Sequence, residues 1–483
     1  MKHNILGKNS YIKYLTIRKM KNIPYFIVGL FLSFISCDEA EDNTLHWADT
    51  QITATETMLI PAIDSKEATT TLQFSNPEAI DYIEIAKIGA DKYMEKINIS
   101  SDTYQFTYKL NENDPEQFSF SVVGYAKDGA ATTPLLLKVD NRKGMFINQV
   151  TRIARITGVP MIGETLPSPN QTAEKWNVGG TDLGIIWELT PGKYGMFFGD
   201  TFGADFKPNP AAPGPNGTSW RSNVLAFSED QNLEDGMTIS DMAKNKAGNA
   251  REIVYGGKDV SGHGNWTSIP TAAIRANGTD YVHYMNIKSW DGWVTNYSGL
   301  YKSTDNGQTW KRCNSVKFAG ESNFGQAAYF KKDGYVYMLG TQTGRNHPAY
   351  LARFKEADIE NQHAYEYWDG NAKTWAKGDE SKATILIPGT VGEASLIFNE
   401  SFQKWIVAYF NEARYNITLQ HADEITGPWS EPIELASGHK YAQLYGSFFH
   451  PLSTKGRNLY FSMSMWLPYN TFLMKVELGG MGK

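Results

Sequence analysis

Short runs of alternating apolar and polar residues follow residue 50, separated by clusters of Asn, Asp, Gly and Pro. Examples are the runs 70–74, 82–86 and 118–123. This alternation predicts half-buried β-strands, and about seven of them within about 90 residues predict an immunoglobulin-like β-sandwich. Residues 51–143 contain no cluster of His, Cys or acidic side chains. We therefore expect this segment to be a spacer, which ends in the polar run 140–144.

From about residue 150 onward the strand pattern continues, but now with a coarse repeat. Five segments share one design, in which a polar residue precedes small residues and then apolar ones. These segments begin at Asp182, Thr271, Gln326, Glu393 and Tyr445. Small residues early in a strand are expected where strands crowd around a central axis. The repeat predicts an all-β fold in which residues 150–483 form a five-bladed β-propeller, with the run 152–156 as an outer strand of the last blade.

One turn motif supports this fold class. The run from Ser303 to Trp310 reads Ser-Thr-Asp-Asn-Gly-Gln-Thr-Trp, which resembles the Asp box of propeller proteins. In that motif Asp305 and Ser303 would bond the turn backbone while Trp310 packs beneath it. Asp boxes lie on the blade rim, so we expect a structural role for Asp305. Sialidases often carry Asp boxes, but Ser268 stands here before Ile-Pro, where the sialidase motif has Arg.

The first 37 residues have the pattern of an export signal. A basic stretch precedes the apolar run 23–32, and small residues precede Cys37. The run is too short to span a bilayer as a helix. Leu32 and Ser36 ahead of Cys37 resemble the lipobox of bacterial lipoproteins, in which the Cys becomes the lipidated first residue. We expect residues 1–37 to be this signal region, the alternative being an uncleaved anchor helix that ends at an incidental Cys.

An acidic stretch follows the predicted lipidation site. Residues 38–42 are Asp-Glu-Ala-Glu-Asp, which resembles the tag that directs some outer-membrane lipoproteins to the cell surface. We therefore interpret residues 38–50 as an acidic linker and expect a lipid-anchored protein of the outer membrane that faces outward. If Cys37 is lipidated, Cys313 is left without a partner for a disulfide.

Charge and motif content exclude several function classes. All six Lys and Arg before Cys37 lie in the signal region, which leaves 40 basic against 52 acidic residues, a net charge of −12, from Cys37 onward. Such a surface is unsuited to nucleic acid. The chain has no CxxC, HExxH, GxSxG or Gly-rich phosphate loop, so the usual zinc, serine-hydrolase and nucleotide sites are not indicated. No cofactor is required, and the sequence leaves open whether a structural metal ion occupies the channel.

Two aspartates are the strongest candidates for chemistry. Asp182 begins one predicted strand and Asp200 ends the next, with a turn at 190–193. A loop of three or five residues would place the two Asp opposite each other, and an even loop would offset them by one. Either way the side chains would lie about 5–8 Å apart. Paired carboxyl groups at a pocket mouth are what glycoside hydrolysis requires. The structural alternative is that each Asp merely caps a turn.

A family resemblance adds to this interpretation. The blocks 179–184, 198–203 and 220–223, with the later Gly-Gln-Ala and Gly-Glu-Ala units, resemble glycoside hydrolase family 183 over residues of about 155–480. This family, formerly a domain of unknown function, contains endo-D-arabinanases that cut internal α-D-arabinofuranosyl linkages of mycobacterial arabinogalactan and lipoarabinomannan. The resemblance places the catalytic pair on Asp182 and Asp200.

Other residues are candidates for binding substrate or assisting the acids. Glu393, Gln326 and Thr271 occupy the equivalent position in other blades. Arg221 could hold a hydroxyl or orient a carboxylate, although an Arg beside a Trp is as often simple packing, and Asn223 belongs to the same block. His263, Trp266 and Trp290 lie in long predicted loops, where aromatic rings can stack on sugars. His263 has no partner at metal-ligand spacing.

The sequence thus predicts a monomeric surface lipoprotein that hydrolyses a furanose-containing polysaccharide, with D-arabinan as the expected substrate. Two alternatives remain open at this level. One is a propeller glycosidase for another polysaccharide, such as L-arabinan. The other is a surface glycan-binding protein that has the cleft and the loop aromatics but no productive acids.

Overall fold

A computed structural model describes residues 47–61, 66–89 and 94–480. Within these ranges the protein is all-β, as predicted, with one short α-helix, α1 (Thr172–Trp176). Single 3₁₀ turns occur at Trp47–Asp49, Pro77–Ala79, Asp291–Trp293, Glu356–Asp358, Gln362–Ala364, Glu380–Lys382 and Pro451–Thr454. The predicted signal region and most of the acidic linker lie outside the described residues. In the described part of the chain, no helix is long and apolar enough to cross a membrane.

The region before residue 141 consists of two antiparallel sheets with one short parallel pairing. One sheet has the order β1-β3-β6, and its strands are β1 (Ile52–Ala54), β3 (Glu67–Phe74) and β6 (Thr103–Lys109). The other has the order β2-β8-β7-β4-β5, from β2 (Met58–Leu59), β8 (Leu135–Asp140), β7 (Gln117–Tyr125), β4 (Tyr82–Lys87) and β5 (Glu95–Asn98). Phe106 of β6 and Phe120 of β7 are fully buried and meet edge to face at 5.2 Å. This contact joins the two sheets into a common core.

Residues 146–479 form five further sheets, each a meander of antiparallel strands. The first comprises β10 (Leu183–Thr190), β11 (Lys193–Phe198), β12 (Val224–Ser228) and β13 (Asp241–Met242). The second comprises β14 (Thr267–Ala276), β15 (Thr279–Ser289), β16 (Val294–Ser303) and β17 (Lys311–Ala319). The third comprises β18 (Gln326–Lys332), β19 (Tyr335–Thr341), β20 (Ala349–Lys355), β21 (Glu366–Asp369) and β22 (Thr374–Lys377).

The last two sheets follow the same plan. The fourth comprises β23 (Ala394–Asn399), β24 (Lys404–Asn411), β25 (Asn416–Ala422) and β26 (Ile433–Ser437). The fifth comprises β27 (Leu444–Phe449), β28 (Asn458–Met465), β29 (Asn470–Gly479) and β9 (Phe146–Arg155). The strand β9 comes from the start of this region and pairs antiparallel with β29, where Arg152 lies opposite Met474. The outer strand predicted at residues 152–156 is therefore confirmed, although the strand begins earlier, at Phe146, and ends at Arg155.

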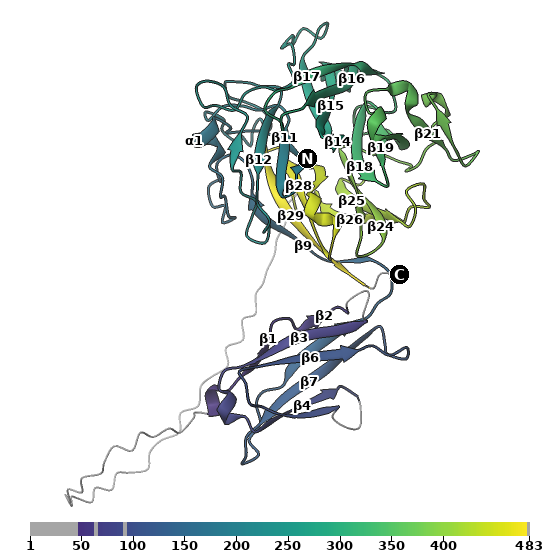
Figure 1. Ribbon diagram of the computed structural model, residues 1–483. Coiled ribbons are helices and arrows are strands. Elements are labelled where there is room, and N and C mark those ends of the chain that lie inside the picture. Colours follow the sequence, from purple (N-terminus) through teal and green to yellow (C-terminus); the bar gives the residue numbers. More distant parts are fainter. Residues whose placement is uncertain (1–46, 62–65, 90–93, 481–483) are drawn as a thin grey trace, which may run out of the picture. The chain divides into compact units, whose positions relative to one another are not determined.

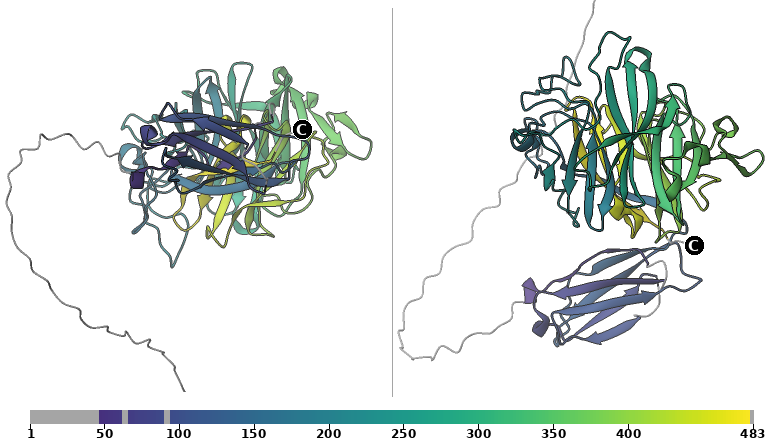
Figure 2. Two further views of the ribbon diagram at one scale, coloured as in Figure 1. Left: turned by 90° about the horizontal axis from the view of Figure 1, so that it is seen from below. Right: turned by 45° about the horizontal axis from the view of Figure 1, so that its top comes forward.

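The first strands of the five sheets lie next to one another in chain order. β10 contacts β14, β14 contacts β18, β18 contacts β23, β23 contacts β27, and β27 contacts β10. Figure 1 shows the sheets following one another around a shared centre, and Figure 2 shows them from two other directions. Every sheet therefore presents the start of its first strand to the same central region, where the polar residues of the repeat lie.

Apolar side chains of these first strands bury one another around the centre. Ile185 of β10, Ile269 of β14, Ile397 of β23 and Phe448 of β27 are buried members of one cluster. Burial of each such side chain contributes about 1.5–3 kcal/mol. The small residues of the repeat, such as the buried Ala327, leave space between the strands. The repeat therefore buries apolar side chains between the first strands and also leaves a cavity along the centre.

The Asp box forms the predicted turn between β16 and β17. Ser303 Oγ accepts a bond from the Gly307 amide at 2.9 Å, and Asp305 Oδ1 accepts one from the Thr309 amide at 2.8 Å. The Trp310 ring packs on Phe197 at 5.2 Å. The motif thus ties the second sheet to the first, and Asp305 has the structural role expected from the sequence.

Candidate active site

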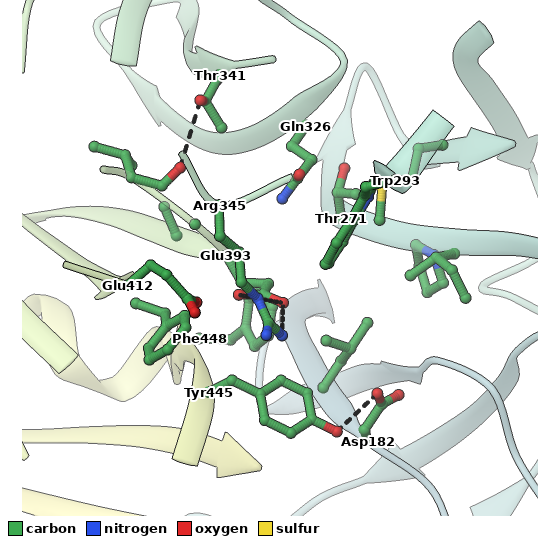
Figure 3. Close-up of a pocket in the computed structure, with 18 of the residues that line it drawn as sticks. Asp182, Thr271, Trp293, Gln326, Thr341, Arg345, Glu393, Glu412, Tyr445 and Phe448 are labelled. Carbon is green, nitrogen blue, oxygen red and sulfur yellow. Dashed lines mark hydrogen bonds and ion pairs between the residues drawn. The ribbon is translucent and has the colours of Figure 1, made fainter. Parts of the chain in front are cut away.

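The five residues that begin the repeat units line one cavity of about 690 Å³. They are Asp182, Thr271, Gln326, Glu393 and Tyr445; four of them lie within one residue of the start of a first strand, and Thr271 lies in the middle of β14. Figure 3 shows them around the cavity together with Arg345, Trp293 and Glu412. The second Asp of the predicted pair, Asp200, lines the same cavity. The ring of first strands therefore brings together residues that are up to 263 positions apart in the sequence.

The β10–β11 hairpin places Asp182 beside Asp200. The strands are joined by a two-residue turn, because Thr190 pairs with Lys193, and Leu183 pairs with Phe198 at the other end. The Gly199 amide donates to the carbonyl of Asp182 at 3.1 Å. Asp182 therefore lies opposite Gly199, one residue before Asp200. The offset is one residue, as expected for an even loop, but two register shifts in the hairpin set its direction, because the two-residue turn alone would place Asp182 opposite Thr201.

The backbone next to Asp182 is held in a strained form. Leu183 has φ +68° and Gly184 has φ +98°, which places both residues in the left-handed region that a Leu rarely adopts. Two hydroxyls from β28 fix this irregularity: Ser464 Oγ accepts from the Leu183 amide at 2.7 Å, and Ser462 Oγ donates to the Gly184 carbonyl at 2.6 Å. Strain of this kind persists only where the surrounding structure imposes it, and it is concentrated at functional sites.

Gly199 provides the space that the Asp182 carboxyl occupies. A Cβ added at Gly199 would overlap Asp182 Oδ1 and would press on the Leu183 side chain. Glycine is therefore required here because of the close approach of a carboxyl group rather than for its backbone freedom. This is a physical reason for the Phe-Gly-Asp order in the block that the sequence analysis singled out.

The surroundings of Asp182 favour its protonated form. Burial is the main cause that raises its pKa to about 8, and the negative charges of Asp200 and Glu393 add to this effect. The Tyr445 hydroxyl donates to Asp182 Oδ2 at 2.9 Å, which partly offsets the rise in pKa by stabilising the charged form. A carboxyl group in this state can donate a proton to a leaving group at pH 7.

Asp200 is held in a different state. It is only 9% exposed, and this burial raises its pKa to about 6. Hydrogen bonds from Thr267 Oγ1 and Trp220 Nε1, each 2.7 Å long, and the charge of Lys258 oppose the effect of burial on the pKa. These contacts favour the ionised form of Asp200, whereas the surroundings of Asp182 favour its protonated form.

An ion pair between the half-buried Arg345 and the buried Glu393 forms another wall of the cavity. The Arg345 guanidinium donates to both carboxylate oxygens of Glu393, with the shortest contact, Nη2 to Oε1, at 2.7 Å. Its charged carbon also lies 5.2 Å from the Trp293 ring and 4.9 Å from the Tyr445 ring. Glu393 is therefore engaged by Arg345 rather than free to act as a third acid. The exposed Glu412 lines the same wall.

Three other predicted residues also line the cavity. Gln326 accepts a bond from the Gly344 amide at 2.6 Å through its side-chain oxygen. The Thr271 hydroxyl is buried and has no hydrogen-bond partner in the described part of the chain. Trp290 is 36% exposed and meets Trp293 edge to face at 5.1 Å. These side chains present polar and aromatic groups to whatever the cavity binds.

Four of the predicted residues lie outside the cavity lining. Arg221 donates to three backbone carbonyls, those of Ser219, Ala250 and Asn177. Asn223 is fully buried and exchanges bonds with the backbone of Val254, among others. His263 is exposed in its loop, and Trp266 packs against the central core. We therefore correct the expectation for these side chains: Arg221, Asn223 and Trp266 support the loops and the core, and His263 faces solvent.

Several cavity residues were not predicted from the sequence. Arg345, Tyr469, Trp466 and Tyr415 line the cavity, and Trp466 and Tyr415 are 38% and 36% exposed. All four lie in the connection that follows the second strand of a sheet, outside the repeat position on which the prediction relied. The only local signal is aromatic content in turns. Among residues 47–61, 66–89 and 94–480, no group of three or more His, Cys, Asp or Glu side chains could hold a metal ion.

A family model covers the whole cavity region. Residues 167–475 match the model described as Domain of unknown function (DUF4185), which is more than half of the chain. The chain belongs to this family. The DUF4185 region runs from just before α1 into β29 and contains every residue that lines the cavity. The chain before it, including the two sheets before residue 141, is additional to the DUF4185 domain.

Relatives of the DUF4185 domain occur in fungi and bacteria. Notoamide biosynthesis cluster protein J of Aspergillus sp. (strain MF297-2) is 29% identical over 324 residues, which cover 63% of this chain and 84% of that protein. An uncharacterized 35.9 kDa protein of Mycolicibacterium smegmatis is 27% identical over 137 residues, 25% of this chain and 39% of that protein. These names do not state a reaction.

Solved structures resemble the chain only distantly. A putative hydrolase from Bacteroides ovatus has a TM-score of 0.46 and 12% identity and covers 63% of this chain and 87% of its own. A family 117 glycoside hydrolase from Zobellia galactanivorans has a TM-score of 0.41 and 10% identity, with coverage of 70% and 90%. These likenesses are too distant to assign a reaction, so the function rests on the site itself.

Proposed function

We propose that the protein is a glycoside hydrolase that uses Asp182 and Asp200 as its catalytic pair. The observation that carries the proposal is that two neighbouring carboxyl groups line one cavity and have different partners: Asp182 accepts a hydrogen bond from Tyr445, whereas Asp200 accepts from Trp220 and Thr267. Two carboxyl groups whose environments separate their pKa values have the acid and base roles assigned to them. The sequence resemblance to family 183 points to the same pair.

In the reaction, Asp182 donates its proton to the glycosidic oxygen as the bond to the leaving sugar breaks. Asp200 acts as the carboxylate partner, either attacking the anomeric carbon or activating a water molecule. Tyr445 holds Asp182 through the 2.9 Å hydrogen bond from its hydroxyl. As Asp182 loses its proton, this bond stabilises the negative charge that develops on its carboxylate, which favours proton release in the transition state.

The cavity supports an uncharged sugar chain as substrate. Four aromatic side chains are exposed among the described residues, and three of them, Trp290, Tyr415 and Trp466, line this cavity. Aromatic faces at the rim of a cavity are typical of sugar stacking. Arg345 is neutralised by Glu393, and Glu412 adds negative charge. This balance disfavours uronic acids and sulfated glycans, so we propose a neutral furanosyl polymer, with D-arabinan from the resemblance.

The remaining organisation is proposed from the sequence and the strand arrangement together. We take the five sheets of residues 146–479 as the blades of a five-bladed propeller, because their first strands contact one another in a closed order. The two sheets of residues 52–140 are taken as an immunoglobulin-like spacer. Lipidation at Cys37 would then anchor a monomer to the outer membrane and present the propeller to polysaccharide outside the cell.

Hydrolysis assays with matched variants test the proposed activity. The protein is incubated with mycobacterial arabinogalactan and separately with plant L-arabinan, and the fragments are sized. We expect arabinogalactan to be cut, and Asp182→Asn and Asp200→Asn each to lower the rate by about 10³-fold or more. Asp235→Asn, which changes an exposed Asp, is the control and should keep full activity.

The possible results separate the alternatives. Binding of arabinan without any cleavage would favour a glycan-binding protein. Cleavage of plant L-arabinan alone would keep the hydrolase but replace its substrate. Unchanged fragment release by both Asp variants would rule out the catalytic pair.

A further inference from the structure

Asp200 is held on one oxygen by two neutral donors. Trp220 Nε1 and Thr267 Oγ1 both donate to Asp200 Oδ1, and both bonds are 2.7 Å long. Thr267 is fully buried. Because both bonds end on Oδ1, the other oxygen, Oδ2, is not used by either donor. Bonds from neutral donors to a buried carboxylate stabilise its charged form.

A lysine lies over the face of the Trp220 indole. Lys258 Nζ is 4.0 Å from the centroid of the Trp220 ring. The ammonium also donates to Ser222 Oγ at 2.8 Å and pairs with Glu252 at 2.9 Å. A cation against an indole face polarises the ring and makes its N–H a better donor. The positive charge of Lys258 also lowers the pKa of Asp200 directly through space.

The loop that carries Lys258 is built to keep it there. Lys258 has φ +62°, a left-handed conformation that is costly for a residue with a Cβ. Its amide donates to the Trp266 carbonyl at 3.1 Å, and the Asp259 amide donates to Asn265 at 2.9 Å. A Cβ on Gly256 would overlap Ser222 Oγ. Backbone strain at Lys258 and the close approach of Gly256 to Ser222 therefore accompany the placement of the Lys258 ammonium group against Trp220.

The other groups that face Asp200 either disfavour its ionised form, opposite to the effect of Lys258, or carry no charge. Glu252 is an acidic neighbour whose negative charge raises the pKa of Asp200, and the protonated Asp182 is neutral. The Tyr469 hydroxyl donates to the backbone carbonyl of Asp200 at 3.2 Å, not to its carboxylate. Glu252 is itself paired with Lys258. Lys258 is therefore the one cation among these described neighbours that favours ionised Asp200.

We propose that Lys258 is a positioning residue that keeps Asp200 ionised, acting through the Trp220 ring and together with Thr267. Asp200 then carries the negative charge of the pair, which leaves Asp182 as the proton donor. The inference rests on the proposed hydrolase function, because it assigns the two carboxyl groups their separate roles. It adds a second layer of residues, outside the cavity lining, that sets the pH range of the reaction.

The pH dependence of kcat/KM tests this assignment. Loss of the cation makes Asp200 easier to protonate, so Lys258→Met should move the acid limb of the profile to higher pH by roughly 0.5–1 unit. Activity below about pH 6 should fall several-fold while the activity at the optimum changes little. Lys258→Arg should restore the wild-type limb. Lys193→Met, which removes the exposed ion pair to Glu229 at 2.8 Å on the same sheet, is the matched control.

A second measurement does not depend on activity. Infrared spectra of protein labelled with ¹³C-carboxyl Asp are recorded across the pH range, and the Asp200 band is identified by its loss in Asp200→Asn. Its titration midpoint should rise in Lys258→Met and return in Lys258→Arg. An unmoved midpoint and an unmoved acid limb in Lys258→Met would overturn the inference. If the wild type cuts no glycan, the proposed function fails, and the infrared midpoint alone decides whether Lys258 keeps Asp200 ionised.

Discussion

Replacing Asp182 by Asn should stabilise the protein at neutral pH while abolishing its activity. Burial and the nearby acidic groups raise the pKa of Asp182 from 3.8 to about 8. Between these two values the folded protein holds a proton that the unfolded chain has lost. The unfolded state thus binds fewer protons, and stability falls as the pH rises through this window. Asn is neutral at every pH, so the variant does not lose stability in this way as the pH rises.

The size of the effect follows from the width of the window. Each pH unit within the window lowers the free energy of unfolding by about 1.4 kcal/mol, so the loss of stability from about pH 4 to pH 7 reaches roughly 4 kcal/mol. Asn keeps the shape of Asp and can still accept the bond from Tyr445, but its amide NH₂ needs a partner of its own. We therefore expect Asp182→Asn to gain about 1–3 kcal/mol at pH 7. Gains of stability on removal of a functional group are typical of active sites.

Urea unfolding followed by tryptophan fluorescence measures this gain. Only Trp47 of the 13 tryptophans lies before residue 150, so the signal reports the region that carries the site. The wild type, Asp182→Asn and the exposed control Asp235→Asn are compared at pH values from about 5 to about 8. The free-energy difference between Asp182→Asn and the wild type should widen with pH, while Asp235→Asn follows the wild type.

A parallel pH dependence of Asp182→Asn and the wild type would refute the reasoning. It would mean that Asp182 ionises in the folded protein as it does in the unfolded chain. Asp182 could not then be the proton donor at neutral pH, and the assignment of the two carboxyl groups would have to be abandoned.

Three further variants examine other parts of the structure. Tyr445→Phe removes the hydrogen bond that stabilises charged Asp182, so the alkaline limb of kcat/KM should move to higher pH; a move to lower pH would contradict the role given to this bond. Arg345→Met leaves the buried Glu393 without its partner and should lower the free energy of unfolding in urea by about 2–4 kcal/mol. The double variant Arg345→Met with Glu393→Gln should recover most of this loss. Equal losses in the single and the double variant would speak against the ion pair. Ser303→Ala removes the hydrogen bonds that the Ser303 hydroxyl makes within the Asp box. It should lower the free energy of unfolding by about 1 kcal/mol and leave kcat/KM unchanged. A loss of activity in the folded variant would contradict the purely structural role given to this turn.

The sequence alone determined the features that depend on neighbouring residues. Alternation and turn residues predicted the strands, and the Asp box predicted its own hydrogen bonds, because these arise within a few positions of one another. The closeness of Asp182 and Asp200 was also predictable, since one hairpin carries both residues, but their exact register was not, because two register shifts change the pairing that the two-residue turn would give. The repeated polar position predicted Glu393 as a cavity residue, because equivalent strands present equivalent residues to a common centre.

Only the tertiary structure decided what these residues can do. Asp182 and Asp200 have the same side chain, but different groups from other parts of the chain act on their pKa values: the negative charge of Glu393 raises that of Asp182, whereas hydrogen bonds from Thr267 and Trp220 lower that of Asp200. Arg345 was missed because its place in the cavity depends on how one sheet meets the next. Arg221, by contrast, was expected at the cavity but is bound to loop carbonyls. Local pattern sets which backbone lies beside which, whereas charge and solvent access at a site are sums over residues that only folding brings together.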